Sequence, residues 1–436
     1  MSGSANIPWY DTCGEASPAT EMLTEDVEFD ISVIGAGVMG LSAALSLAEA
    51  GYRVVVLEAE DVGAGASGRN GGMIIPIMRT APETILKILG RKGERLIKAV
   101  IRSADAVFEL VDKHSISCDP VRNGFLQPVH ARSMASKVEN MTDSWSRWGA
   151  DCSYIDAGET ASHLGTDTYY GALFEPGGGY LNPIAYTRGL ARAAISRGAA
   201  IYIRSPVSAA KHRIDNRWQL TAGKGSVLSG TVVQCTGVQV PGLPFHTGAP
   251  AVNSLIPMVL HGLATKPLPK TLRNRILPNK CVATDTRSCV LSVGYDSKHR
   301  LVTSGASLLG DGKLGMKRMA RFVAARLERV YPVLSGIQFE YIWTGTAALN
   351  RHWLPSLYET APDWYALTTC NGRGMALSTI TGQLFGKALA SGNLENFVLP
   401  RAKPNPVALR KVIGGVLARV LIPAGALQDR WCELLP

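Results

Sequence analysis

The sequence predicts an α/β fold, because short β-branched runs alternate with a helix-forming segment near the amino end. Residues 30–34 have the composition of a strand that is buried on both faces of a parallel sheet. Residues 41–50 are rich in helix formers and end at Gly51, and residues 53–57 form a second apolar run. A strand, a helix and a second strand in this order are typical of a βαβ unit in a parallel sheet.

The turn between the first strand and the helix has the spacing G-x-G-x-x-G. Gly35 allows a tight turn, Gly37 lets the backbone approach a pyrophosphate, and Gly40 brings the helix close to the strand. Glu58 ends the second strand, where its carboxylate can accept hydrogen bonds from ribose hydroxyls. The pattern predicts a dinucleotide site, and a glycine-rich turn without a ligand is the alternative. The residues expected in this part of the site are Ile34, Gly35, Ala36, Gly37, Val38, Met39, Gly40, Glu58 and Ala59.

A second glycine-rich loop follows at residues 63–72. Its many glycines make it too flexible to be a structural element, and its polar residues make it unsuited to the hydrophobic core. It offers backbone N–H donors together with the side chains of Ser67, Arg69 and Asn70. We expect it to bind a second polar part of the cofactor. The residues assigned to this contact are Gly65, Ala66, Ser67, Arg69, Asn70, Gly71, Gly72 and Met73.

These motifs resemble those of the FAD-dependent amine and amino-acid oxidoreductases of the D-amino-acid oxidase (DAO) family. The loop at residues 65–72 is most similar to the branch that contains gamma-glutamylputrescine oxidase, and Pro8-Trp9-Tyr10 resembles an aromatic pair that this branch carries before its first strand. The resemblance covers nearly the whole chain and implies FAD as the cofactor. No histidine- or cysteine-linked flavin pattern matches, so we expect the FAD to be noncovalent.

The resemblance also implies a domain organisation, in which a Rossmann-like FAD-binding domain is interleaved with a mixed-sheet substrate domain. The FAD-binding domain would comprise residues 28–80, 150–245 and 340–398, and the substrate domain residues 81–149 and 246–339. Residues 1–27 would form an amino-terminal arm, and residues 399–436 a basic tail that is helical. Further cofactor contacts are implied at Val207, Cys235, Thr236, Gly237, Gly345, Gly372, Arg373, Gly374 and Met375.

The implied chemistry is oxidation of a C–N bond of an amine, with hydride transfer to the flavin and hydrolysis of the imine to a carbonyl compound and an amine or ammonia. Such chemistry needs few acid–base side chains and no metal. The catalytic candidates are His261, His352 and Arg69, with a hydrogen-bonded core histidine as the alternative for His261.

Two carboxylate-binding positions of the family are not matched. Gly294 stands where some relatives carry an arginine, and Met375-Ala376 follows Gly374 where others carry a lysine. This difference favours an amine over an α-amino acid as the substrate. Residues 301–305 lack the lysine that activates dioxygen in one branch, so dioxygen and another electron acceptor both stay open.

Composition limits the other classes of function. With 46% hydrophobic and 18% charged residues, the 436-residue chain is not intrinsically disordered. Its eight cysteines form no C-x-x-C pair, which indicates a reducing compartment, and the acidic amino end lacks the features of a secretory signal, so we expect a cytoplasmic protein.

The net charge of +10 permits an anionic partner, but the basic residues form no stripe interleaved with aromatic residues, so no nucleic acid is expected. Apolar residues between 409 and 420 fall at helical spacing and predict a basic amphipathic helix. We expect it to pack on its own protein, with membrane contact as the alternative. The alternative functions are a biosynthetic flavoenzyme that oxidises or aromatises a larger nitrogen-containing intermediate, a tRNA-linked flavoprotein and a redox-silent FAD-binding protein.

Overall fold

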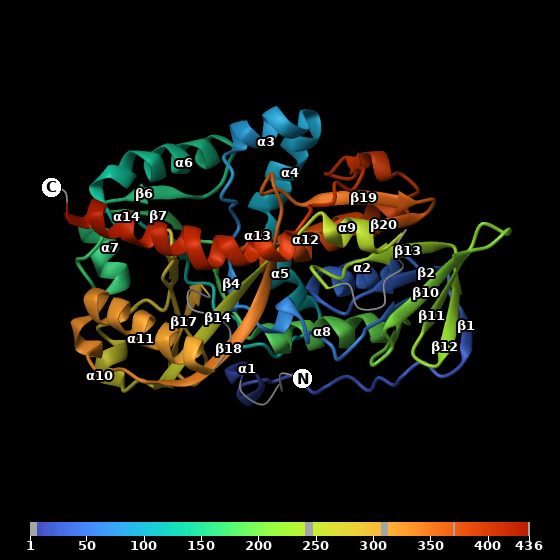
Figure 1. Ribbon diagram of the computed structural model, residues 1–436, viewed down its shortest axis with the longest axis horizontal. Coiled ribbons are helices and arrows are strands. Elements are labelled where there is room, and N and C mark those ends of the chain that lie inside the picture. Colours follow the sequence, from blue (N-terminus) through green and yellow to red (C-terminus); the bar gives the residue numbers. More distant parts are fainter. Residues whose placement is uncertain (1–6, 240–246, 307–312, 369–370, 435–436) are drawn as a thin grey trace.

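A computed structural model describes residues 7–239, 247–306, 313–368 and 371–434. Two large sheets organise this part of the chain (Figure 1), one with seven strands and one with eight. The first lies with β2, β13 and α2 on the right of the view, and the second lies with α11 and β17 on the left. The predicted α/β class is confirmed.

The seven-stranded sheet contains the predicted βαβ unit. Its central strands β13, β2, β3 and β9 are parallel to one another, and β20 is parallel to β13, while β19 is antiparallel to β20. Every residue of β2 and β3 is buried, as their β-branched composition predicts. The strand order is β21 (Arg401–Ala402), β19 (Ser356–Ala361), β20 (Trp364–Thr368), β13 (Thr231–Gln234), β2 (Ile31–Ile34), β3 (Val54–Leu57) and β9 (Ala200–Tyr202).

Two long apolar helices cross closely beside this sheet, α2 (Val38–Glu49) and α12 (Gly374–Ala390). The contact depends on Gly382, because a Cβ atom there would lie 2.4 Å from the carbonyl oxygen of Met39. Eleven of the twelve residues of α2 are buried, so its low amphipathicity reflects burial on all sides. The start of α2 is therefore held from the side of α12 as well as from the sheet.

The eight-stranded sheet receives strands from distant parts of the chain. On one face it packs against α11 (Lys313–Val330), where Met319 and Val323 contact Gly305. This sheet includes β6, β7 and β18. Sequence analysis expected the FAD-binding domain to contain β6, β7 and all of β18 except its first residue. The strand order is β18 (Phe339–Leu349), β14 (Ile256–Pro267), β17 (Arg300–Ala306), β16 (Ser292–Tyr295), β15 (Val282–Thr284), β5 (Phe125–Pro128), β7 (Ala172–Glu175) and β6 (Ser153–Ile155).

Smaller elements complete the fold around the two sheets. One sheet has the order β1 (Asp26–Glu28), β12 (Gly225–Ser229), β11 (Trp218–Ala222) and β10 (Val207–His212), and β4 (Met73–Ile74) pairs with β8 (Gly179–Tyr180). The remaining α-helices before residue 400 are α1 (Pro8–Asp11), α3 (Pro82–Leu89), α4 (Arg91–Ile101), α5 (Ser103–Lys113), α6 (Ala135–Arg147), α7 (Ala157–Leu164), α8 (Pro183–Ser196), α9 (Ala249–Asn253) and α10 (Lys270–Arg273).

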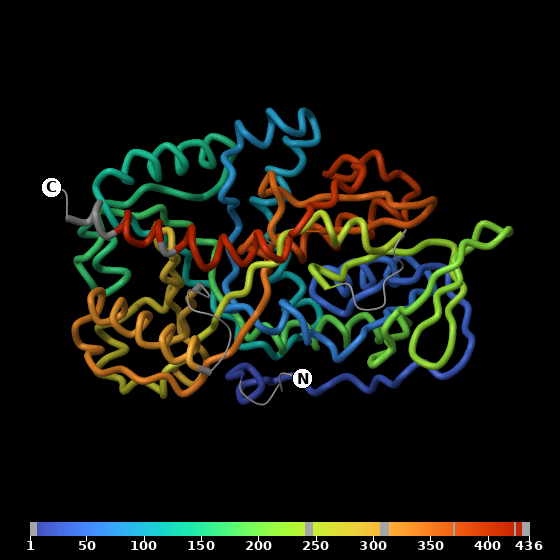
Figure 2. Tube along the Cα trace, viewed as in Figure 1, coloured from blue at the N-terminus to red at the C-terminus, as the bar shows by residue number. Residues whose placement is uncertain are grey.

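The basic tail is helical, as the sequence predicts. It contains α13 (Arg410–Val416), a π-helical turn (Leu417–Leu421) and α14 (Ile422–Leu434). These three elements, called the C-terminal helix below, form one long segment that runs across the face of the molecule (Figure 2).

Candidate functional site

The glycine-rich turn brings the ends of two parallel strands against the start of α2. Gly35 has a positive φ of 108°, and a Cβ atom there would lie 2.7 Å from the carbonyl oxygen of Cys235, which follows β13. A Cβ atom at Gly40 would lie only 2.1 Å from the carbonyl oxygen of Gly35. The helix can approach the turn this closely only because residue 40 is glycine.

The amino end of α2 carries no side-chain cap from its own N-cap residue, Gly37. Ser67 from the second glycine-rich loop reaches it instead, and its Oγ accepts a hydrogen bond of 3.0 Å from the N–H of Val38. The two glycine-rich segments therefore meet at one helix N-terminus, whose N–H groups and dipole favour an anion.

Glu58 lies at the end of β3, beside the same turn. Its Oε2 accepts a hydrogen bond of 2.8 Å from the N–H of Ala36, and its Oε1 accepts one of 3.0 Å from the N–H of Glu60. Burial raises the pKa of this carboxyl, and the two backbone donors oppose that effect. The carboxylate is thus held next to the turn, at the position where the sequence predicts a ribose-binding group.

Two tryptophan side chains hold the second loop in place. Trp9 Nε1 donates to the carbonyl oxygen of Asn70 at 2.9 Å, and Trp343 Nε1 donates to that of Arg69 at 2.9 Å. The Asn70 side chain also closes the loop on itself, since it donates to the carbonyl of Ser67 at 2.7 Å. Sequence analysis assigned the loop, but it did not find these two donors.

Arg69 is held against β18. Its Nε donates to the carbonyl oxygen of Ala64 at 2.7 Å, and its Cβ is the atom nearest to the position of a side chain at Gly345. These contacts bring Arg69 and Gly345 together, and they use the guanidinium to order the loop. The structure therefore favours a positioning role for Arg69 over a catalytic one.

The end of β13 carries a buried polar network that sequence analysis did not find. Gln234 accepts a hydrogen bond of 3.0 Å from Trp364 Nε1, and its Nε2 donates to Thr236 Oγ1 at 3.2 Å and to the Gly248 carbonyl at 3.0 Å. This network fixes the chain just before Gly237, whose φ of 58° turns it away from the strand. Burial raises the pKa of the neighbouring Cys235 thiol to about 12, so the thiol stays protonated.

Val207 occupies a different position from the other predicted contacts. It starts β10 and is 3% exposed, and it belongs to the same apolar cluster as Ile34 and Leu57, which end β2 and β3. The residue therefore lies beneath the nucleotide-binding edge of the sheet.

The last predicted segment lies at the start of α12. Gly372 has a φ of 82°, and Gly374 is the first residue of α12 and is followed by the buried Met375. Arg373 is buried, and its two terminal nitrogens donate to the Ile77 carbonyl at 3.3 Å and to Gln127 Oε1 at 3.1 Å. Burial lowers the pKa of Arg373 well below its usual value, and the charge of a second arginine, Arg79, adds to this effect.

Arg79 is a residue that sequence analysis missed. Its side chain has solvent-accessible area, yet the protein around it is dense enough that desolvation lowers the pKa of its guanidinium. It makes no hydrogen bond or ion pair with any residue that the structure describes. Its place beside Arg373 depends on tertiary structure, so the sequence carries no signal for it.

The two histidine candidates lie apart from each other. His261 is 1% exposed, and it pairs across the strands with Gly305, whose open side contacts Met319 and Val323 of α11. Its neighbour Gly262 lies on the other face, against Trp343. This placement favours the core role for His261. His352 is exposed in the turn between β18 and β19.

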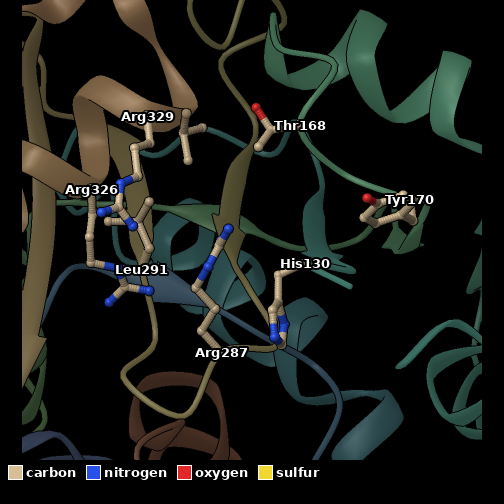
Figure 3. Close-up of a pocket in the computed structure, with 8 residues that line it drawn as sticks. His130, Thr168, Tyr170, Arg287, Leu291, Arg326 and Arg329 are labelled. Carbon is tan, nitrogen blue, oxygen red and sulfur yellow. The ribbon is translucent and has the colours of Figure 1, made fainter. Parts of the chain in front are cut away.

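A separate pocket opens beside α11. It encloses about 230 Å³, and Arg287, Arg326 and Arg329 point toward the same space (Figure 3). Arg287 is paired with Asp285, from which Arg326 is 3.9 Å away. No residue of the two glycine-rich segments lines this pocket, so it is distinct from the nucleotide site.

The arrangement at α2 defines a dinucleotide-binding protein of the Rossmann-like type. Its parts fit FAD: a helix N-terminus without a cap from its own N-cap residue for the pyrophosphate, a carboxylate for the ribose and a second loop held against β18. Within the described ranges, no group of three or more histidine, cysteine, aspartate or glutamate residues is placed to hold a metal ion.

Comparison with known proteins identifies the family. Residues 30–388 match the DAO family, described as "FAD dependent oxidoreductase". The chain belongs to this family, and it is an FAD-dependent oxidoreductase.

Individual relatives are similar over most of their length. "Probable oxidoreductase OrdL" of Haemophilus influenzae is 29% identical over 369 residues, which cover 84% of each chain. Gamma-glutamylputrescine oxidoreductase of Escherichia coli is 27% identical over 384 residues, which cover 86% of this chain and 87% of the relative. The crystal structure of glycine oxidase from Geobacillus kaustophilus matches with a TM-score of 0.69 and 19% identity, over 85% of this chain and 96% of that one.

Proposed function

We propose that the protein oxidises a C–N bond of an amine. The proposal is carried by the arrangement of Gly35, Gly40 and Glu58 around the start of α2, in a chain that matches the family from residue 30 to residue 388. The gamma-glutamylputrescine oxidoreductase relative has an amine in its name, which supports this class of substrate. Noncovalent FAD and a cytoplasmic location are parts of the same proposal.

Bound FAD supplies the two-electron acceptor for hydride from the carbon next to the amine nitrogen. Loss of this hydride and one N–H proton gives an imine, and water then releases a carbonyl compound and an amine or ammonia. The residues of this chain bind and orient. The start of α2 and Ser67 would hold the pyrophosphate, Glu58 would hold the ribose, and the loop ordered by Trp9 and Trp343 would shape the cofactor site.

We propose further that the amine substrate carries an anionic group. Arg79 supports this proposal, because it is an accessible cation without a hydrogen bond or ion pair to any described residue, although the charge of Asp285 partly offsets its loss of solvation. Arg373 places a second cation close enough for the two charges to interact. These arginines lie outside the two family positions at which sequence analysis looked for a carboxylate clamp. A substrate that carries a carboxylate at some distance from its amine agrees with the accessible Arg79 and with the absence of a clamp at the two family positions.

The test is anaerobic reduction of the purified holoenzyme by three sets of compounds: polyamines, acylated polyamines that carry a carboxylate, and α-amino acids. We expect the carboxylate-bearing amines to bleach the flavin fastest and the product to be a carbonyl compound. Substitution Arg79→Gln should raise KM for these amines at least tenfold and change KM for uncharged amines less than twofold. Equal changes of KM for the carboxylate-bearing and the uncharged amines would contradict the proposed anionic group but would not contradict amine oxidation.

Two other outcomes decide between the remaining functions. A product that has lost two hydrogens without hydrolysis would favour the biosynthetic flavoenzyme. A protein that binds FAD but is reduced by none of the compounds would contradict amine oxidation. Admission of air then separates dioxygen from another electron acceptor, because only an oxidase regains its oxidised spectrum quickly.

A further inference from the structure

The C-terminal helix is a long apolar segment, and the rest of the protein covers little of its surface. The stretch Arg410–Asp429 is, by length and composition, apolar enough to cross a membrane, yet only 12% of it is buried in the protein. Sequence analysis expected this helix to pack on its own protein. The helix does lie on the protein, and Ala418, Ile422 and Ala426 face inward, but most of its large apolar side chains are exposed.

The inner face of the helix is fixed by polar and close backbone contacts. Arg410 is buried, and it donates to the carbonyl oxygens of Val252 at 3.2 Å and Leu255 at 3.1 Å. One turn later, a Cβ atom at Gly414 would lie 2.0 Å from the Pro257 carbonyl, so the backbone of the helix touches β14 there. Near the other end, Asp429 accepts hydrogen bonds of 2.7 and 3.0 Å from the N–H and Oγ of Ser288.

These anchors lie at both ends of the helix, so they determine both its rotation and its path along the surface. They hold the helix flat on the protein rather than projecting from it (Figure 2). A helix held in this way can lie in the plane of a membrane but cannot span it without losing the anchors.

The opposite face exposes apolar side chains. Leu409 is 75% exposed and Leu427 is 72% exposed, and five more lie between them. This outer stripe contains half of the large exposed apolar side chains among the described residues, and it consists of Leu409, Val412, Ile413, Val416, Val420, Leu421 and Leu427. A contiguous apolar stripe of this kind on a protein surface marks an interaction site.

The segment that carries most of the stripe is basic. Residues 396–428 contain no aspartate or glutamate, and they contain five lysine or arginine residues. Lys403 and Lys411, near the start of the helix, are exposed. An outward apolar stripe with exposed cations beside it is complementary to a surface that combines hydrocarbon with negative charge.

We propose that the C-terminal helix binds the surface of an anionic lipid bilayer, with the outer stripe at the boundary between headgroups and acyl chains. Lys403 and Lys411 then lie near the lipid phosphates. A second copy of the chain fits less well, because the helix offers no acidic residue between 396 and 428 to pair with these lysines across a symmetric contact.

The test is co-sedimentation of the full-length holoenzyme with vesicles of phosphatidylcholine alone or with about one-third phosphatidylglycerol. We expect stronger binding to the anionic vesicles, with a decrease at high salt. The double variant Val416→Glu/Val420→Glu should lower the partition coefficient at least tenfold, because it places two carboxylates in the apolar contact. Lys403→Gln/Lys411→Gln should weaken binding to the anionic vesicles alone.

Ile214→Glu is the matched control, because Ile214 is fully exposed in the turn between β10 and β11. It should bind vesicles within twofold of the wild type, and all variants should keep their flavin content and amine oxidation. The proposal is overturned if the wild type binds neither vesicle or if Val416→Glu/Val420→Glu binds as well as Ile214→Glu. It is also overturned if sedimentation analysis shows a dimer that the double variant dissociates, since a second copy then covers the stripe.

Discussion

Gly40 provides a direct test of how the βαβ unit binds FAD. A Cβ atom at residue 40 would lie 2.1 Å from the carbonyl oxygen of Gly35. Both atoms belong to the backbone framework, so no flexible side chain can move to relieve the contact. Substitution Gly40→Ala must shift either the start of α2 or the glycine-rich turn by more than 1 Å to restore an ordinary contact of about 3.4 Å.

The start of α2 has little freedom to move. On its other side, Gly382 of α12 lies so close that its own Cβ would be 2.4 Å from the Met39 carbonyl. Overpacking of a tight contact costs about 1–3 kcal/mol. Because the displaced atoms carry the phosphate-binding N–H groups, we expect much of this cost to appear in FAD affinity, with a rise in Kd of roughly 5- to 150-fold.

The assay is fluorescence titration of the apoprotein with FAD, together with thermal unfolding of the apoprotein and holoprotein. Gly415→Ala is the matched control: nothing lies within 4 Å of its Cβ position, and it is in α13, outside the nucleotide site. This control should leave the Kd for FAD unchanged and keep or slightly raise the Tm, since alanine favours a helix. If Gly40→Ala binds FAD within twofold of the wild type at an unchanged Tm, the close approach of α2 is not needed for binding.

Three further substitutions probe the same site. Burial raises the pKa of Glu58, so the stability that its protonated form contributes to the apoprotein is present at acidic pH and is lost as the pH rises through the raised pKa. Glu58→Gln should therefore flatten the decrease of apoprotein Tm with rising pH. An unchanged profile of Tm against pH would exclude Glu58 as the source of the decrease. Gln234→Leu leaves the buried Trp364 N–H without its acceptor, which should lower the free energy of urea unfolding by about 2–4 kcal/mol, and a loss below 1 kcal/mol would contradict the network. Trp343→Phe removes the donor to Arg69 and should raise the Kd for FAD about fivefold, while Trp353→Phe, at an exposed position, should not change it.

The parts of the site that the sequence predicts are those encoded by neighbouring residues. Gly35, Gly40 and Glu58 lie within one βαβ unit, so their spacing alone determines that they meet at the start of α2. The remaining contacts join distant segments. Trp364 is 130 residues from Gln234, and no local pattern indicates that the two side chains share a hydrogen bond.

Alternation and helical spacing identify faces but not their partners. The period of two along β14 places His261 and Gly262 on opposite faces of the sheet. Only the tertiary structure shows that α11 lies on the His261 face and Trp343 on the Gly262 face. The C-terminal helix is a second case. Its apolar spacing is clear in the sequence, but the buried contacts of Arg410 and Gly414 decide that the apolar face points outward.

The amino-terminal arm connects the second glycine-rich loop to the eight-stranded sheet. Arg300 of β17 is buried, and it binds Asp296, Asp11 and the carbonyl oxygen of Pro8, which fixes α1 against the eight-stranded sheet. From this position Trp9 donates to Asn70 and packs edge-to-face on Trp343, with ring centroids 6.3 Å apart. Both indoles hold the same loop, and one comes from the arm and the other from β18. Movement of the eight-stranded sheet relative to the arm must therefore disturb the second glycine-rich loop. Trp9 therefore helps to order the second glycine-rich loop, and the Arg300 contacts connect that loop to the eight-stranded sheet.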